Sequence, residues 1–141
     1  MQLITANRIP WDRLLGLLAS SQAHLFDCDL ESKLPEKHGV YAISVGDGED
    51  TKFVWVGITD RSKRGLRRRV WEDHYKNPTN TSDLPNVLVK VGAATNTKDA
   101  KRWITRACKV RWIEVEDERM RMLLEHYATA LLQPDPTAGS K

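Results

Sequence analysis

The sequence has only two cysteines, no apolar run long enough to span a membrane, and no repeat or low-complexity block. Cys28 and Cys108 lie far apart, which argues against a disulfide-stapled secreted scaffold and against a zinc site of paired cysteines. The four histidines do not complete a zinc motif either. The first residues lack the basic segment and apolar run of a signal peptide. We therefore expect a soluble, intracellular (cytoplasmic) protein without a membrane partner.

The charge of the chain is only mildly basic. The formal net charge is +3 and the isoelectric point is about 8.9, so bulk electrostatics alone identify no nucleic-acid partner. The 141 residues are enough for one domain with a hydrophobic core. We expect one folded domain whose function depends on where the charges lie.

Periodicity predicts a chain of alternating helices and strands. The runs HGVYAISV and TKFVWVGI are rich in β-branched and aromatic residues and are separated by Gly-Asp-Gly, which indicates a hairpin. The expected elements are, in order, helix 10–21, strand 38–45, strand 51–58, helix 60–75, strand 87–91, helix 97–107, strand 110–115 and helix 117–132. The fold class is α/β (α+β), with a small antiparallel or mixed sheet of three to four strands flanked by helices.

Basic residues are concentrated in one segment. They are Arg61, Lys63, Arg64, Arg67, Arg68 and Arg69. Such a cluster forms either a solvated helix face or a positive surface that binds nucleic acid. Arg69 differs from the others because it shares a helical stripe with Leu66 and Val70. A half-buried guanidinium needs an anionic partner, which can be a protein carboxylate or a phosphate.

Three further residues have two interpretations each. Glu125 has largely apolar neighbours, so burial of its charge needs compensation by a divalent cation or by Arg69. Tyr41 lies in the middle of a strand, where a tyrosine is ordinarily a core residue. Gly57 at the end of a strand indicates a turn, a bulge or the close approach of another group.

The order and spacing of these residues resemble the GIY-YIG nuclease superfamily. The matching elements are Gly39-Val40-Tyr41, Trp55-Val56-Gly57, Leu66-x-x-Arg69-Val70, and Glu125 nine residues before Pro134. The resemblance covers residues 34–134. It implies a nuclease-like domain there, preceded by an accessory helix and lead-in at 1–33 and followed by a loose tail at 135–141.

The resemblance implies a metal-dependent endonuclease that hydrolyses phosphodiester bonds in DNA. In that family the residue matching Tyr41 is the general base, the one matching Arg69 contacts the phosphate, and the one matching Glu125 binds one Mg²⁺ or Mn²⁺ ion. Gly39, Trp55 and Gly57 complete the motifs. DNA is the expected partner, with a homodimer or a separate targeting subunit as a source of specificity.

The chain departs from the family pattern at three positions. Trp55 replaces a tyrosine and so removes a hydroxyl, and Thr137 replaces an asparagine. Asp73 stands where a histidine is usual, and His74 follows it, so either an irregular helix recruits His74 as a catalytic residue or that role is absent. The alternatives to an active nuclease are a nucleic-acid-binding module without turnover, and a chance match in which Arg69 pairs with Glu125.

Overall fold

The computed structural model describes residues 10–59, 65–78, 81 and 83–138 of the chain. Its elements are α2 (Trp11–Ser20), β1 (His24–Leu25), α3 (Leu30–Lys33), β2 (Gly39–Val45), η1 (Gly48–Asp50), β3 (Lys52–Ile58), η2 (Arg67–Lys76), α4 (Leu84–Lys90), α5 (Thr97–Ala107), β4 (Cys108–Glu114) and α6 (Glu118–Leu132). A four-stranded antiparallel sheet is flanked by helices, which confirms the predicted fold class.

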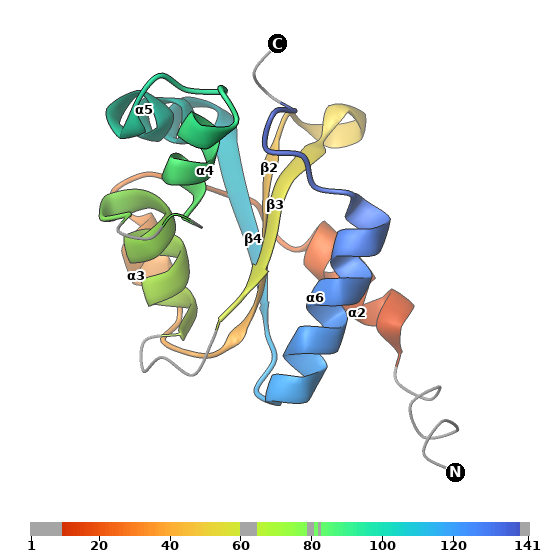
Figure 1. Cartoon of the computed structure of the whole chain (residues 1–141). Helices are drawn as coiled ribbons and strands as arrows, with labels where there is room; N and C mark the ends of the chain where they lie inside the picture. Colours follow the sequence, from red (N-terminus) through yellow and green to blue (C-terminus); the bar gives the residue numbers. More distant parts are fainter. Residues whose placement is uncertain (1–9, 60–64, 79–80, 82, 139–141) are drawn as a thin grey trace.

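The sheet separates two layers of helices. Its strand order is β1-β4-β2-β3 and every pairing is antiparallel. The helices α3, η2, α4 and α5 lie on one face, and α2 and α6 lie on the other (Figure 1). Each face has its own apolar core. Tyr41 and Ile43 of β2 belong to the first core, whereas Val40 and Ala42 belong to the second, as the period of two along a strand requires.

The central position of β2 follows from its sequence. All seven of its residues are buried, because both faces of the strand are covered by helices. β3 pairs with β2 in the predicted hairpin, and the register shifts between Ile43 and Ser44. The hairpin prediction is confirmed. β2 therefore positions its side chains rigidly between two neighbouring strands.

The predicted strand at residues 87–91 is wrong. The residues form α4 instead, which has Pro85 in its first turn and Leu84 and Leu88 buried four positions apart. A short, mostly apolar run of five residues fits a turn of a buried helix as well as a strand. The fourth strand is β1, whose two residues pair with Lys109 and Val110 of β4.

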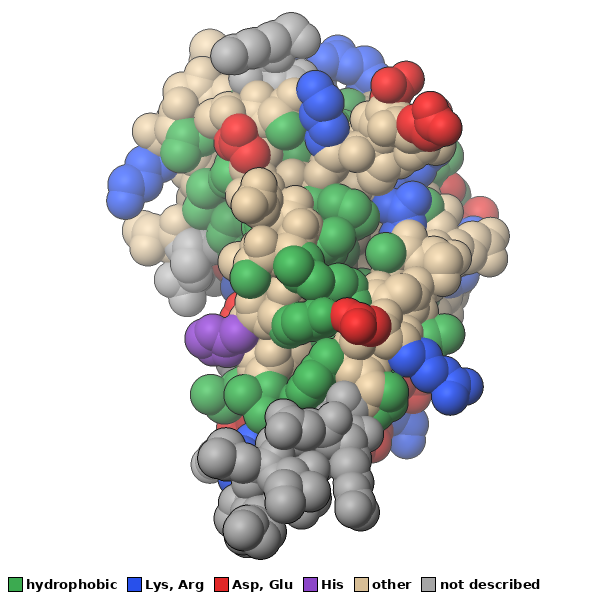
Figure 2. All heavy atoms as spheres, turned by 90° about the vertical axis from the view of Figure 1, so that its right-hand side faces the viewer, with side chains coloured by type: hydrophobic (Ala, Val, Ile, Leu, Met, Phe, Trp, Pro, Cys, Tyr) green, Lys and Arg blue, Asp and Glu red, His purple; other side chains and the backbone are tan. Residues whose placement is uncertain are grey.

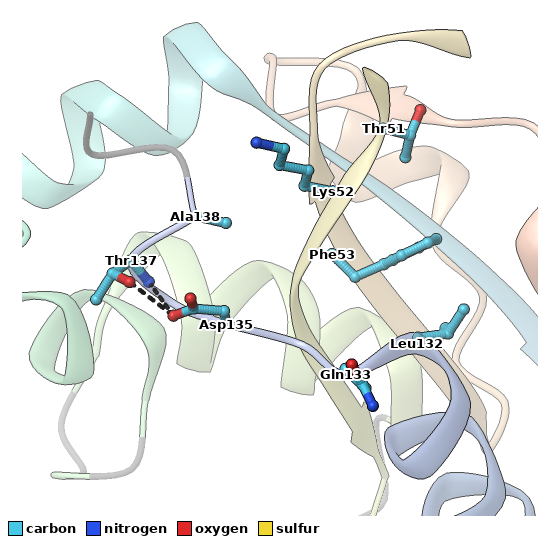
Figure 3. Close-up of a pocket in the computed structure, with 8 residues that line it drawn as sticks. All are labelled: Thr51, Lys52, Phe53, Leu132, Gln133, Asp135, Thr137 and Ala138. Carbon is cyan, nitrogen blue, oxygen red and sulfur yellow. Dashed lines mark hydrogen bonds between the residues drawn. The ribbon is translucent and has the colours of Figure 1, made fainter. Parts of the chain in front are cut away.

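The segment after α6 runs along the outer edge of β3. Gln133 ends the helix in the left-handed conformation, and the Asp135 amide donates a hydrogen bond to the Phe53 carbonyl. Thr137 donates two hydrogen bonds to the Asp135 carboxylate, and a pocket of about 450 Å³ lies between this segment and β3 (Figure 3). Ala138 packs against the first core. Residues 135–138, assigned to a loose tail from sequence, thus contact the sheet.

The layer of α2 and α6 presents apolar side chains to solvent. Leu17, Met122, Leu123 and Leu131 are each more than 40% exposed, and Figure 2 shows apolar side chains gathered on this side of the molecule. Leu18 of α2 is fully buried in the second core, so this helix is part of the domain. None of the described helices is long and apolar enough to cross a membrane.

We predict that Gly39→Ala destabilises the protein by about 1–3 kcal/mol, the usual range for overpacking. A methyl group at Gly39 would come closer than 3.0 Å to the Ile113 carbonyl oxygen of β4, and backbone in a central strand cannot move aside cheaply. Chemical denaturation measures the change. Gly16→Ala is the control, because Gly16 lies in α2 with open space around it, and alanine there should stabilise the helix by about 0.5–1 kcal/mol. Equal effects of the two substitutions would contradict the prediction.

Candidate functional site

Tyr41 lies in the middle of β2 with its ring across Gly57. The two residues are paired in the β2–β3 register, and a methyl group at Gly57 would lie within 3.0 Å of the Tyr41 hydroxyl oxygen. Gly57 is therefore a position of close approach, one of the alternatives left open by the sequence. The approaching group is the tyrosine itself. Any side chain at Gly57 would push the hydroxyl out of its place.

The helix that faces Tyr41 is irregular. Residues Arg67–Lys76 form a π-helix, in which hydrogen bonds run from one residue to the fifth one on. In an α-helix of about 3.6 residues per turn, His74 would lie well off the face of Arg69. The wider turn brings His74 onto that face, toward the sheet. Of the two alternatives for His74, the structure has the irregular helix.

His74 links Tyr41 to the start of α4. Its Nε2 lies 2.5 Å from the Tyr41 hydroxyl oxygen, and its Nδ1 accepts a hydrogen bond of 2.9 Å from the Leu84 amide. An amide nitrogen can only donate, so Nδ1 carries no proton. Burial, together with the positive charge of Arg69, holds the pKa of His74 well below its usual value. The neutral ring therefore has its proton on Nε2 and donates to Tyr41.

The Tyr41 hydroxyl is surrounded by hydrogen-bond donors. Burial raises the pKa of Tyr41 to about 12, while the charge of Arg69 and hydrogen bonds from Trp55 and Arg69 lower it. The indole, the guanidinium and the neutral His74 can each donate but cannot accept at these atoms. Donors that meet at one oxygen stabilise negative charge on it. The surroundings of Tyr41 thus favour a phenolate, and its burial opposes one.

Arg69 is held by two carboxylates. Its Nη1 lies 2.9 Å from Asp83 and 3.4 Å from Asp73. Asp83 is 1% exposed and the side chain of Arg69 is 23% exposed. Burial lowers the pKa of Arg69, but the neighbouring Tyr41 and the two carboxylates raise it above its usual value. The partners of Arg69 are therefore these aspartates rather than Glu125.

Glu125 lines a separate pocket beside Trp55. The pocket is about 250 Å³ in volume, and Trp55, Thr129 and Pro134 are among its other lining residues. Trp55 also contacts the His74 ring at a centroid distance of 5.4 Å, so its indole borders both the Tyr41 cluster and this pocket. Within the described ranges, no three His, Cys, Asp or Glu side chains group together to hold a metal ion. A single carboxylate fits Mg²⁺, because that ion keeps several waters and binds substrate phosphates.

The predicted basic surface is only partly described. Arg61, Lys63 and Arg64 lie outside the described residues. Arg67 is tied to the core layer, because its side chain donates to the Leu34 carbonyl and pairs with Glu36 at 3.1 Å. Arg68 is exposed. The described part of the cluster therefore combines one structural arginine, one solvent-facing arginine, and Arg69 of the Tyr41 cluster.

Gly39 serves the site indirectly. Its lack of a side chain lets β2 approach the Ile113 carbonyl, and its own carbonyl accepts a hydrogen bond from the Thr59 amide at the end of β3. The hairpin register that sets Tyr41 opposite Gly57 is fixed at this end.

Sequence reasoning missed Asp83 as a site residue. Its signal is the segment Asp83-Leu84-Pro85, an aspartate before a proline in the first turn, which is typical of a helix start. Once 87–91 is assigned to a strand, that signal is lost. With the helix in place, Asp83 and the Leu84 amide both face the η2 residues.

No protein-family model matches this chain, and comparison with the curated proteins and with the solved structures finds no similar protein.

We predict that His74 makes the protein less stable in mild acid. The pKa of His74 is lower in the folded protein than in the unfolded chain. The contribution of His74 to stability is therefore complete above its unfolded pKa of about 6.5, and it is lost as the pH falls toward the pKa in the folded protein. The loss is about 1.4 kcal/mol for each pH unit in that window. The free energy of unfolding measured between pH 7.5 and 5 in wild type and His74→Asn should show a steep slope that the substitution flattens.

His126→Asn, an exposed position on α6, is the control and should leave the slope unchanged. His24, whose pKa is also lowered, chiefly by burial, contributes a smaller slope of the same sign that remains in the variant. A slope equal in wild type and His74→Asn would show that His74 is not buried as a neutral ring.

Proposed function

We propose that the protein is a metal-dependent endonuclease that hydrolyses phosphodiester bonds in DNA. The observation that carries the proposal is the meeting of His74, Arg69 and Trp55 at the Tyr41 hydroxyl, from two strands and an irregular helix. π-Helical segments are rare and occur frequently at functional sites. A buried polar cluster of this kind is also an expensive way to fill a core that apolar side chains could fill.

Tyr41 is the proposed general base. With a pKa of about 12, only about one phenol in 10⁵ is ionised at pH 7. That value already includes the lowering by Arg69 and Trp55, and His74 is a donor to Tyr41 rather than a base itself. Arg69, in contact with Tyr41 and 23% exposed, is the proposed contact for the phosphate.

The carboxylates around Arg69 support a need for a cation. Asp73 and Asp83 both pair with the Arg69 guanidinium, which leaves less of its positive charge for a phosphate. Glu125 places a further carboxylate next to Trp55, where a divalent ion would add positive charge. Glu125, with the Thr129 hydroxyl one turn away, is the proposed ligand of Mg²⁺ or Mn²⁺. Bound there, a divalent ion would neutralise the phosphate and lower the pKa of a coordinated water.

The test is nicking of supercoiled plasmid in Mg²⁺ or Mn²⁺ by wild type, Arg69→Lys, Glu125→Gln and Tyr41→Phe. We expect each substitution to lower the rate by about 100-fold or more, the usual effect of removing one group that stabilises a transition state. Arg69→Lys keeps the charge but loses the planar fork, so the buried Asp83 retains a cation.

Arg102→Ala and Glu118→Gln are the matched controls. Both positions are exposed, on α5 and α6, and should keep wild-type rates. Cleavage that survives in Arg69→Lys and Glu125→Gln would contradict the proposed roles of Arg69 and Glu125. Absence of cleavage by wild type on supercoiled, single-stranded and branched DNA would contradict the proposed activity.

A second candidate is a nucleic-acid-binding module without turnover. The specific observation in its favour is that Tyr41 and His74 are both fully buried, so that no water reaches the phenol. In that case exposed basic residues such as Arg68 would contact the phosphate backbone of the nucleic acid. A second copy of the chain or a separate subunit would supply specificity under either candidate.

The binding candidate predicts a steep salt dependence. Each phosphate contact makes the slope of log affinity against log salt more negative by about 0.9, so Arg68→Ala should make the slope about one unit less negative and weaken binding. Fluorescence anisotropy of a labelled duplex in EDTA measures both. Arg102→Ala is the control. Binding that is insensitive to salt would exclude this candidate, whereas metal-dependent cleavage would replace it with the nuclease.

A further inference from the structure

Asp83 is an aspartate at a helix start that does not cap its own helix. It flanks α4 in an extended conformation, where an aspartate ordinarily accepts a hydrogen bond from an amide of the first turn. Its side chain makes no such capping bond. The carboxylate instead lies 2.9 Å from Arg69 Nη1 and is 1% exposed. By contrast, Asp117 at the start of α6 caps its helix, accepting from the Met120 amide at 2.9 Å.

The pairing with Asp83 sets which way the guanidinium points. An arginine has five N–H groups in a rigid plane, so holding Nη1 at one edge fixes the direction of the other edges. Asp73, four residues after Arg69 in η2, contacts the same Nη1 at the longer distance of 3.4 Å. The remaining donors of Arg69 are left to reach Tyr41, whose pKa they lower.

The next residue holds the second donor. The Leu84 amide donates to His74 Nδ1, which leaves the proton on Nε2, the atom that faces Tyr41. Two consecutive residues at the start of α4 thus orient both groups that η2 presents to the Tyr41 oxygen. An aspartate that only stabilised the helix would accept a hydrogen bond from an amide of the first turn.

We propose that Asp83 is a positioning residue that holds the Arg69 guanidinium toward the Tyr41 hydroxyl. Its significance for catalysis rests on the proposed nuclease function, but the orientation itself does not. Asp83 acts through Arg69 and does not touch substrate. Without it, Arg69 turns toward solvent, and Tyr41 loses one of its donors.

The chain has three tyrosines, so a protein labelled with ¹³C at tyrosine Cζ gives three signals that report on each hydroxyl. Tyr41→Phe identifies the signal of Tyr41. We expect Asp83→Ser to shift the Tyr41 signal while those of Tyr75 and Tyr127 stay in place, because serine keeps a capping group for α4 but cannot pair with Arg69. Asp83→Asn, which keeps an acceptor oxygen at the same distance, should give a smaller shift.

Asp117→Ser is the matched control and should move none of the three signals, since it makes the same change at a helix start remote from Arg69. If Asp83→Ser does not fold, the shift of the Tyr41 signal in Asp83→Asn is the test. A Tyr41 signal that coincides with wild type in the folded Asp83 variant would overturn the proposal.

The plasmid assay separates this proposal from the proposed function. If the protein is a nuclease, Asp83→Ser should lower kcat by about 10-fold to 100-fold with little change in KM, the effect of a misplaced catalytic group. An unchanged kcat in a cleaving enzyme would overturn the role of Asp83 in the reaction. A shifted Tyr41 signal without cleavage by any protein would support the positioning and reject the nuclease.

Discussion

The hydrogen bond between Tyr41 and His74 fixes several parts of the fold at once. Both side chains are fully buried, so their polar atoms must find partners inside the protein. The tyrosine can lie flat only over Gly57, and His74 can reach it only from the wider turn of η2. The other imidazole nitrogen requires the Leu84 amide. Strand register, helix irregularity and the start of α4 therefore depend on one buried contact.

The fold was predictable from the sequence where the pattern was long. β2 and β3 are seven-residue strands rich in β-branched and aromatic residues, and α5 and α6 have apolar positions at helical spacing over eleven and fifteen residues. Short segments were not predictable. Residues 87–91 were assigned to the wrong element, because a mostly apolar run of five residues is too short for its period to separate a strand from a buried helix. The two residues of β1 are a strand only through their pairing with β4.

The candidate site was predictable as a set of residues but not as a network. Motif order singled out Tyr41, Gly57 and Arg69, and the offset of His74 raised the possibility of an irregular helix. The π-helix itself is decided by contacts to Tyr41 and Leu84, which lie 33 and 10 positions from His74. No local pattern contains such information. The pairing of Arg69 with Asp83 was hidden because it depends on α4 being a helix.

Arg121 shows how a structural role of an arginine differs from the one we propose for Arg69. Arg121 is 3% exposed and donates to the carbonyls of Val115 and Glu116, which close the loop before α6. Those acceptors are neutral and lie close in sequence. Arg69 instead meets two carboxylates and a phenol drawn from three elements. Apolar side chains would fill that space at lower cost, since an ion network must overcome the desolvation of each charge. The arrangement brings hydrogen-bond donors to the Tyr41 oxygen, where they would stabilise the negative charge that develops in the proposed reaction.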